Sequence, residues 1–267
     1  IDTLIASFLT TGSISWLYFS DRLVEFPLGV FGIALATAVL PNLSEKHAQG
    51  SSEKFSDTLD WSMRCIFLIA LPATIGLAML AAPLLITLFN YKEFSILDVL
   101  MTSYSLKAYA IGLPAFVLIK VLSAGFFSRQ DTKTPVKIGL IAVVANIVLN
   151  ILLVWLFNYI NLAHVGLALA TSLSAYLQAF LLFRKLKKIK VYRSRNKWLG
   201  FIAKIILALA VMVGIIVFGV DHSSVWVSWD VFDRILNLML WVLVSMLSYF
   251  SVLWLTGLRL RNITTPE

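Results

Sequence analysis

Charged residues and cysteines are scarce in this sequence. Only 13% of its 267 residues are Asp, Glu, Lys or Arg, whereas 60% are hydrophobic. A water-soluble domain of this length needs a more polar surface, so the composition indicates a polytopic membrane protein. The single cysteine, Cys65, lies in an apolar run and has no partner for a disulfide within the chain, which indicates a packing role.

Motifs for enzymatic chemistry are missing as well. The sequence has no Gly-rich phosphate loop and no nucleophile elbow, and His47, His164 and His222 have no Cys or His neighbours at zinc spacing. We therefore expect no enzymatic activity and no bound cofactor, but a chain that transports or holds another molecule. Because an apolar run is already under way at Ile1, we also expect the chain to be part of a longer protein.

The sequence is rich in long apolar runs. Eight of them have roughly 20 residues, the length at which a helix crosses about 30 Å of hydrocarbon. They lack the alternation of barrel strands, so we expect an all-α polytopic membrane protein with eight transmembrane helices. The expected spans are residues 1–20, 24–43, 61–89, 99–127, 136–157, 165–183, 199–220 and 235–257.

Basic residues between the expected spans predict the orientation. The segments 41–64, 128–137 and 184–197, together with the tail from Arg259, contain sixteen Lys and Arg residues, against three in the segments on the other side. This bias places these segments and the C-terminus in the cytoplasm. It also explains the net charge of +8 without a nucleic-acid partner. The basic run at 184–190 either sets the topology alone or also contacts anionic lipid headgroups.

Three charges lie between the first two expected spans. Asp21, Arg22 and Glu25 share one face if the segment is helical. Unpaired charge in lipid costs several kcal/mol, so the cluster is a candidate functional site; the alternative is a charged cap that ends a helix. The following segment, 27–32, contains one proline and two glycines, which predict a bend in the second span.

A second polar set is spread over three expected spans. Asp2 lies in the first, Asn146 and Asn150 lie four residues apart in the fifth, and Thr171 lies in the sixth. Carboxylate, amide and hydroxyl oxygens suit sodium or a proton relay better than a soft metal. The alternative is hydrogen bonding between helices, which contributes about 1 kcal/mol per contact. No other metal site is expected.

Two motifs carry a family resemblance. The segment 21–37, followed by Leu40 and Pro41, resembles the hallmark stretch of the MviN/MurJ family of lipid II flippases, and so does the segment 127–137. The resemblance covers essentially the whole chain. It implies the C-terminal lobe of a fourteen-helix exporter of the multidrug/oligosaccharidyl-lipid/polysaccharide superfamily. Residues 1–183 would form the lobe, 184–198 a basic cytoplasmic loop, 199–257 two additional transmembrane helices and 258–267 a cytoplasmic tail.

The resemblance also implies a function. The family carries lipid II, the undecaprenyl-pyrophosphate-linked peptidoglycan precursor, from the inner to the outer leaflet of the bacterial inner membrane by alternating access. Arg22 would contact the pyrophosphate, while Glu25 and Asp21 would hold or release Arg22. The Asp2, Asn146, Asn150 and Thr171 set would bind a coupling cation, and the last two spans would form a lipid-facing groove for the polyprenyl tail.

The same resemblance implies further partners, namely membrane lipids and an N-terminal six-helix lobe that this sequence does not contain. Two alternatives belong to the same superfamily, a multidrug/sodium antiporter and a polysaccharide-lipid flippase. The loop motif at 128–137 argues against both. A third alternative is a membrane scaffold that transports nothing and organises cell-wall enzymes.

Overall fold

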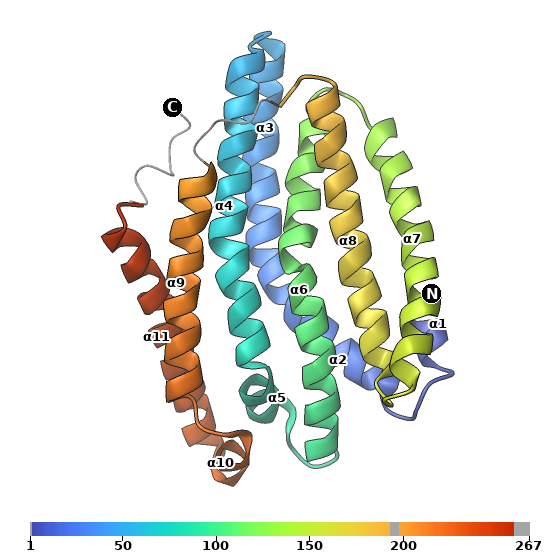
Figure 1. The fold of residues 1–267 in the computed structure, drawn as a ribbon, viewed down its shortest axis with the longest axis vertical. Coiled ribbons are helices and arrows are strands. Elements are labelled where there is room, and N and C mark those ends of the chain that lie inside the picture. The colour runs from blue at the N-terminus through green and yellow to red at the C-terminus, as the bar shows by residue number, and fades with distance from the viewer. Residues whose placement is uncertain (1, 193–197, 259–267) are drawn as a thin grey trace.

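The fold is a bundle of long helices. A computed structural model describes residues 2–192 and 198–258, and every regular element in these ranges is a helix (Figure 1). Seven helices within these ranges are long and apolar enough to cross a membrane. The prediction of an all-α polytopic membrane protein is therefore confirmed, although the number of spans is seven in the described residues instead of eight.

Six of these spans lie close to predicted ranges. The helices after the first span are α4 (Ser52–Met79), α5 (Ala81–Phe89), α6 (Ile96–Phe127), α7 (Lys133–Asn158), α8 (Ala163–Lys188), α9 (Trp198–Gly219), α10 (Ser223–Ser228) and α11 (Val231–Leu255). The predicted span 61–89 is divided between α4 and the short helix α5. The predicted basic run at 184–190 begins within α8, which continues to Lys188. Residues 193–197 and 259–267, which belong to the predicted basic loop and tail, lie outside the described residues. The predicted domain limits stay predictions.

The first two predicted spans are replaced by a different arrangement. Among the described residues before Gly12, only α1 (Asp2–Ala6) is helical, and Gly12 has a φ of 100°. From Ser13 the chain then forms one continuous helix of 36 residues, composed of α2 (Ser13–Pro27), the π-helix η1 (Leu28–Ile33) and α3 (Ala34–Ala48). The predicted break at residues 21–23 is wrong, because the charges there are accommodated on the exposed surface of this helix.

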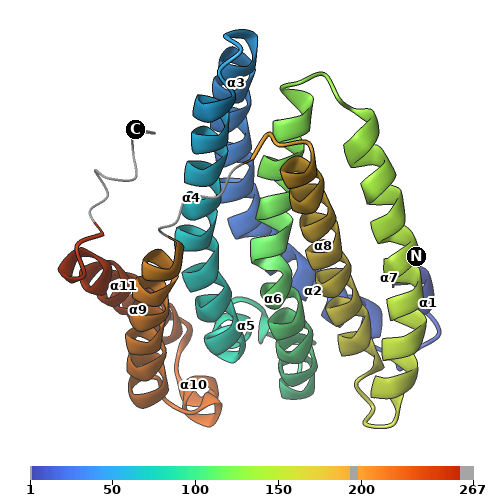
Figure 2. The same cartoon turned by 45° about the horizontal axis from the view of Figure 1, so that its top comes forward.

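Helix α6 lies at the centre of the bundle and packs against α2, α3, α4 and α8 (Figures 1 and 2). Two glycines allow close approach. A Cβ atom at Gly112 of α6 would lie 2.5 Å from the Ser172 Oγ of α8, and one at Gly166 of α8 would lie 2.7 Å from the Leu153 carbonyl oxygen of α7. Helices α9 and α11 form a separate pair that packs against α4 and α5.

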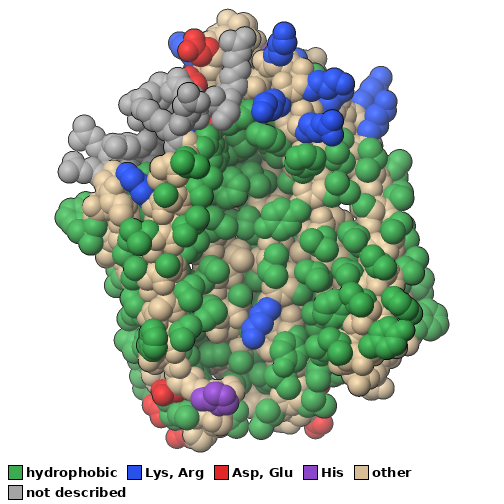
Figure 3. All heavy atoms as spheres, in the orientation of Figure 1, with side chains coloured by type: hydrophobic (Ala, Val, Ile, Leu, Met, Phe, Trp, Pro, Cys, Tyr) green, Lys and Arg blue, Asp and Glu red, His purple; other side chains and the backbone are tan. Residues whose placement is uncertain are grey.

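The two ends of the bundle differ in charge. The α3–α4 turn, the α6–α7 turn and the end of α8 lie at the same end, at the top of Figure 1, and Lys and Arg side chains gather there in Figure 3. We call it the basic end. The described parts of the predicted cytoplasmic segments therefore share one side of the bundle, while the opposite end carries α10 and the α5–α6 and α7–α8 connections.

Candidate functional site

Arg22 lies on an exposed face of α2. Its Nη1 donates to Glu25 Oε2 at 2.5 Å, one turn further along the helix. Its Cζ also lies 5.2 Å from the centroid of the Tyr18 ring, one turn before it. The spacing of four and three residues places the three side chains on one side of α2, whereas Leu17 and Val24 are buried in the bundle.

This exposure distinguishes the cluster from a helix cap. The side chains of Arg22 and Glu25 are 57% and 49% exposed, although they lie ten and thirteen residues into an apolar helix counted from Gly12. An arginine paired on one edge of its guanidinium keeps donors for another partner. Asp21 interacts electrostatically with Glu25, with Arg22 and also with Asp2 of the second polar set. The structure thus places all three predicted charges together, but in the interior of a helix.

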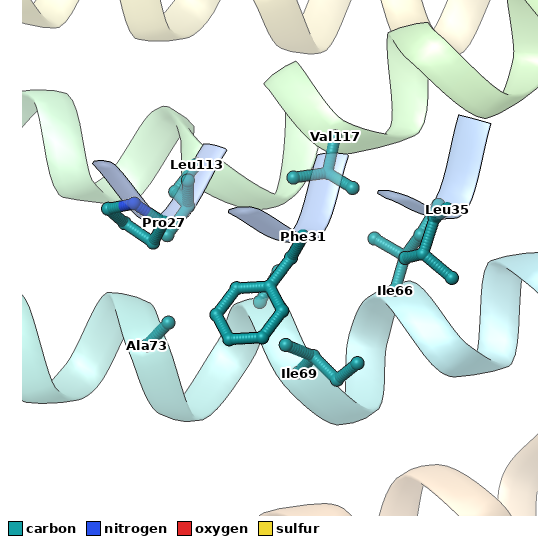
Figure 4. Close-up of a pocket in the computed structure, with 9 residues that line it drawn as sticks. Pro27, Phe31, Leu35, Ile66, Ile69, Ala73, Leu113 and Val117 are labelled. Carbon is teal, nitrogen blue, oxygen red and sulfur yellow. The ribbon is translucent and has the colours of Figure 1, made fainter. Parts of the chain in front are cut away.

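The π-helical segment η1, called the π-turn below, follows the cluster directly. Pro27 has no N–H to donate to the turn before it, and the chain continues through η1 before α-helical geometry resumes at Ala34. Beneath it lies a small apolar pocket, in which the Phe31 ring points toward Ile69 of α4, and Val117 of α6 lines the other side (Figure 4). A π-turn is a frequent site of bending and function, so the helix has a built-in bend between the charges and α3.

The second predicted set is also assembled, from three helices. Asn150 Nδ2 of α7 donates to Asp2 Oδ1 of α1 at 2.7 Å and to Asn146 Oδ1 at 3.2 Å. Thr171 Oγ1 of α8 donates to Asp2 Oδ2 at 3.0 Å. Asn150 is fully buried, and its Oδ1 has no hydrogen-bond partner in the described part of the chain.

The unpaired oxygen bears on what the set can bind. The four side chains supply carboxylate, amide and hydroxyl oxygens, which are hard ligands. With its amide oriented as here, Asn150 satisfies Asp2 as a donor; turning the amide would direct Oδ1 at the Asp2 carboxylate, an arrangement that needs a cation or a proton between them. The described residues hold no cluster of three or more His, Cys, Asp or Glu side chains for a metal, and a single carboxylate suits a monovalent ion.

Sequence reasoning missed two groups. Tyr18 was not predicted as part of the cluster, although its position four residues before Arg22 is a usable signal. The second group surrounds Asp60 of α4, which is 4% exposed. It accepts hydrogen bonds from the Tyr192 hydroxyl at 2.6 Å and from the Trp198 Nε1 at 2.8 Å. No local sequence signal predicts these contacts, because the partners are more than 130 residues away.

Comparisons with known proteins agree on one family. A family model described as "Lipid II flippase MurJ" matches residues 1–240. A "Probable lipid II flippase MurJ" of Vibrio cholerae is 48% identical over 98% of this chain and 49% of its own length. The corresponding protein of Haemophilus influenzae is 46% identical over 100% of this chain and 52% of its own. A "Lipid II flippase MurJ" of Burkholderia cenocepacia is 36% identical over 97% of the chain.

A solved structure shows the same similarity in three dimensions. It is titled "Lipid II flippase MurJ, inward closed conformation", has a TM-score of 0.75 and 25% sequence identity, and covers 94% of this chain and 48% of its own. The chain thus spans about half the length of the relatives that it matches.

Proposed function

Because this chain belongs to the lipid II flippase MurJ family, we propose that it forms part of a transporter that moves lipid II from the inner to the outer leaflet of the bacterial inner membrane. The observation that carries the proposal is the exposed Arg22 on α2. A cation that is not enclosed by its own half of a transporter is available to a cavity shared with another lobe. In the full-length protein we assign that lobe to the N-terminal half of the relatives.

The chemistry of lipid II supports this role for Arg22. Its pyrophosphate is strongly charged, and transferring it through hydrocarbon without partners is very costly. A guanidinium offers two parallel donors that match phosphate oxygens. Glu25 now occupies one edge of the Arg22 fork, so we propose that the pyrophosphate replaces Glu25 when the cavity is loaded and that Glu25 returns when it is released. Asp21 adds negative charge beside the fork and favours release.

We also propose that the Asp2 set binds a coupling cation, sodium or a proton. A cation on Asp2 neutralises a carboxylate that interacts electrostatically with Asp21. Less negative charge near Asp21 strengthens the hold of Arg22 on a phosphate. The cation and the lipid headgroup are then linked through neighbouring side chains of α1 and α2. The unpaired Oδ1 of buried Asn150 supports a ligand at this point.

The experiment that tests the function uses the full-length protein in liposomes that contain lipid II. The measurement is the amount of lipid II headgroup that becomes accessible to a membrane-impermeant reagent on the opposite side. We expect exposure above that of protein-free liposomes. An antiporter for multidrug substrates or a cell-wall scaffold would leave the accessibility at the protein-free level, and that result would overturn the proposal.

A further inference from the structure

An apolar crevice lies on the side of the bundle where α9 approaches α8. Its volume is about 520 Å³, and all of its lining side chains are hydrophobic or aromatic. Leu71 of α4 and Leu118 of α6 form part of its floor, while Phe180 of α8 and Ile206 of α9 form its walls. The last two are 58% and 59% exposed, so the crevice opens to the surroundings of the bundle. Figure 3 shows the hollow surface beside the basic end.

The rim of the crevice at the basic end is held by a buried carboxylate. Tyr192 and Trp198 line the crevice, and both donate to Asp60, at 2.6 and 2.8 Å. Arg64 Nε donates to the other oxygen of Asp60 at 2.8 Å, and the Arg64 Cζ lies 5.0 Å from the centroid of the Trp198 ring. Three donors on one carboxylate give a preformed rim, because each ring is fixed by a hydrogen bond as well as by packing.

The crevice is separate from the site around Arg22. The pocket beneath the π-turn is lined by Ile66 and Ala70 of α4, whereas the crevice is lined by Met63 and Phe67 of the same helix. Taken together, the α4 residues that line the pocket, Ile66, Ile69, Ala70 and Ala73, point about 110° away from those that line the crevice, Met63, Phe67 and Leu71, at 100° per residue. The α4–α6 pair therefore stands between the crevice and α2. A chain in the crevice is therefore separated from a headgroup at Arg22 by these two helices.

Basic residues continue the crevice wall toward the water. Along α8, Tyr176, Phe180 and Phe183 line the crevice, and the next position on the same face is Lys187, with Arg184 beside it. Both side chains are exposed. A membrane-facing apolar groove below basic side chains at one bilayer surface has the two features that an anionic lipid recognises, one for its chain and one for its phosphate.

We infer that the crevice holds an acyl chain of an anionic phospholipid from the leaflet at the basic end, with the lipid phosphate at Arg184 and Lys187. The lipid fills the gap between α8 and α9. It thereby connects the α9–α11 pair to the rest of the bundle as a structural component. This site is additional to the one proposed for lipid II and does not depend on transport activity.

The test measures lipids retained by the purified full-length protein, using native mass spectrometry after exchange into phosphatidylglycerol or phosphatidylcholine. We expect phosphatidylglycerol to be retained preferentially. Ile206→Trp should fill the crevice and reduce retention, and its matched control is Leu207→Trp, an exposed α9 position that is not among the crevice-lining residues. The double variant Arg184→Gln/Lys187→Gln should reduce retention of phosphatidylglycerol about 30-fold.

The matched charge control is Lys185→Gln/Lys188→Gln, which removes the same charge from α8 positions that are turned away from the crevice-lining face. Equal loss in this variant would overturn the phosphate position, because it would show that overall charge attracts the lipid. Full retention in Ile206→Trp would overturn the crevice as the chain site. Equal retention of phosphatidylcholine, or stronger retention of a polyprenyl phosphate offered in competition, would overturn the assignment to an anionic phospholipid.

Discussion

Asn150 Nδ2 donates a hydrogen bond of 2.7 Å to the carboxylate Oδ1 of Asp2, a residue 148 positions earlier in the chain. This bond joins the short helix α1 to the middle of α7, and Thr171 extends the contact to α8. The oxygen of the same amide is buried without a partner in the described part of the chain. The contact therefore both holds α1 in place and leaves an acceptor available.

If the Asp2 set binds the coupling cation, Asp2→Asn should remove the cation dependence of lipid II exposure. An asparagine side chain has nearly the same shape and keeps one oxygen for Asn150 or Thr171, so the helices should remain packed. The measurement is lipid II accessibility in liposomes with and without a sodium or proton gradient. Asp221→Asn, at an exposed position beyond α9, is the control. An unchanged cation response in Asp2→Asn would leave the set with a hydrogen-bonding role only.

Arg22→Ala should reduce lipid II transport by roughly 10- to 100-fold, since a hydrogen bond to a charged group contributes about 1.5–3 kcal/mol. Arg22→Lys keeps the charge but loses the fork, and we expect intermediate activity. Lys92→Ala removes a positive charge from the exposed α5–α6 connection and should have no effect. Wild-type transport by Arg22→Ala would disprove the proposed pyrophosphate contact, and full rescue by lysine would show that charge alone suffices.

Gly166→Ala should destabilise the protein by about 1–3 kcal/mol, the usual cost of overpacking. The new Cβ would lie 2.7 Å from the Leu153 carbonyl oxygen, which is backbone of α7 and cannot rotate away. Gly214→Ala in α9 is the matched control, because nothing lies within 4 Å of its Cβ position and alanine favours the helix. Thermal unfolding in detergent should show a lower midpoint for the first variant only; equal midpoints would mean that α7 and α8 adjust freely.

The start of α7 should be sensitive to acid. Two hydrogen bonds from Thr134, one from its hydroxyl at 2.7 Å and one from its N–H at 3.0 Å, lower the pKa of the Asp131 carboxyl below its usual value. A carboxyl with a lowered pKa stabilises the folded state above its unfolded pKa, and that contribution is lost as pH falls through the folded pKa.

Asp131→Asn should therefore be less stable than the wild type at neutral pH, with a difference that shrinks in acid. The measurement is the unfolding midpoint of both proteins as a function of pH. A difference that stays constant with pH would show that the carboxylate charge is not what stabilises this turn.

The orientation can be tested with single cysteines, because the natural Cys65 is buried. Lys188→Cys at the basic end and Glu93→Cys at the opposite end are both at exposed positions. With the basic end in the cytoplasm, an impermeant thiol reagent added outside the cells should label Glu93→Cys only. Labelling of Lys188→Cys instead would reverse the orientation.

Much of this protein could be predicted from local sequence. Apolar runs of the right length predicted α6, α7, α8, α9 and α11, because a helix that crosses lipid must be apolar along its whole length and must satisfy its own backbone. The basic segments predicted that the α3–α4 turn, the α6–α7 turn and the end of α8 share one side. The motifs at 21–37 and 127–137 predicted the family, which the comparisons confirmed.

Tertiary structure decided what local patterns could not. Arg22 was predicted to mark a break between two spans, yet pairing with Glu25 and an exposed helix face allow one helix to continue past it into the π-turn at Leu28–Ile33. The residues around Arg22 are compatible with a break as well as with a continuous helix. The packing of the opposite face of α2 against α6 selects the continuous helix.

The same reason applies to the two polar assemblies. By itself the sequence determined an all-helical chain, its spans from α6 onward and its charged end, since each depends on residues that are neighbours in the chain. Only the folded bundle decided that Asp2 meets Asn150 and that Asp60 meets Trp198, because these contacts join residues more than 130 positions apart. Such contacts form where helices cross, and helix crossings depend on how whole surfaces of side chains fit together.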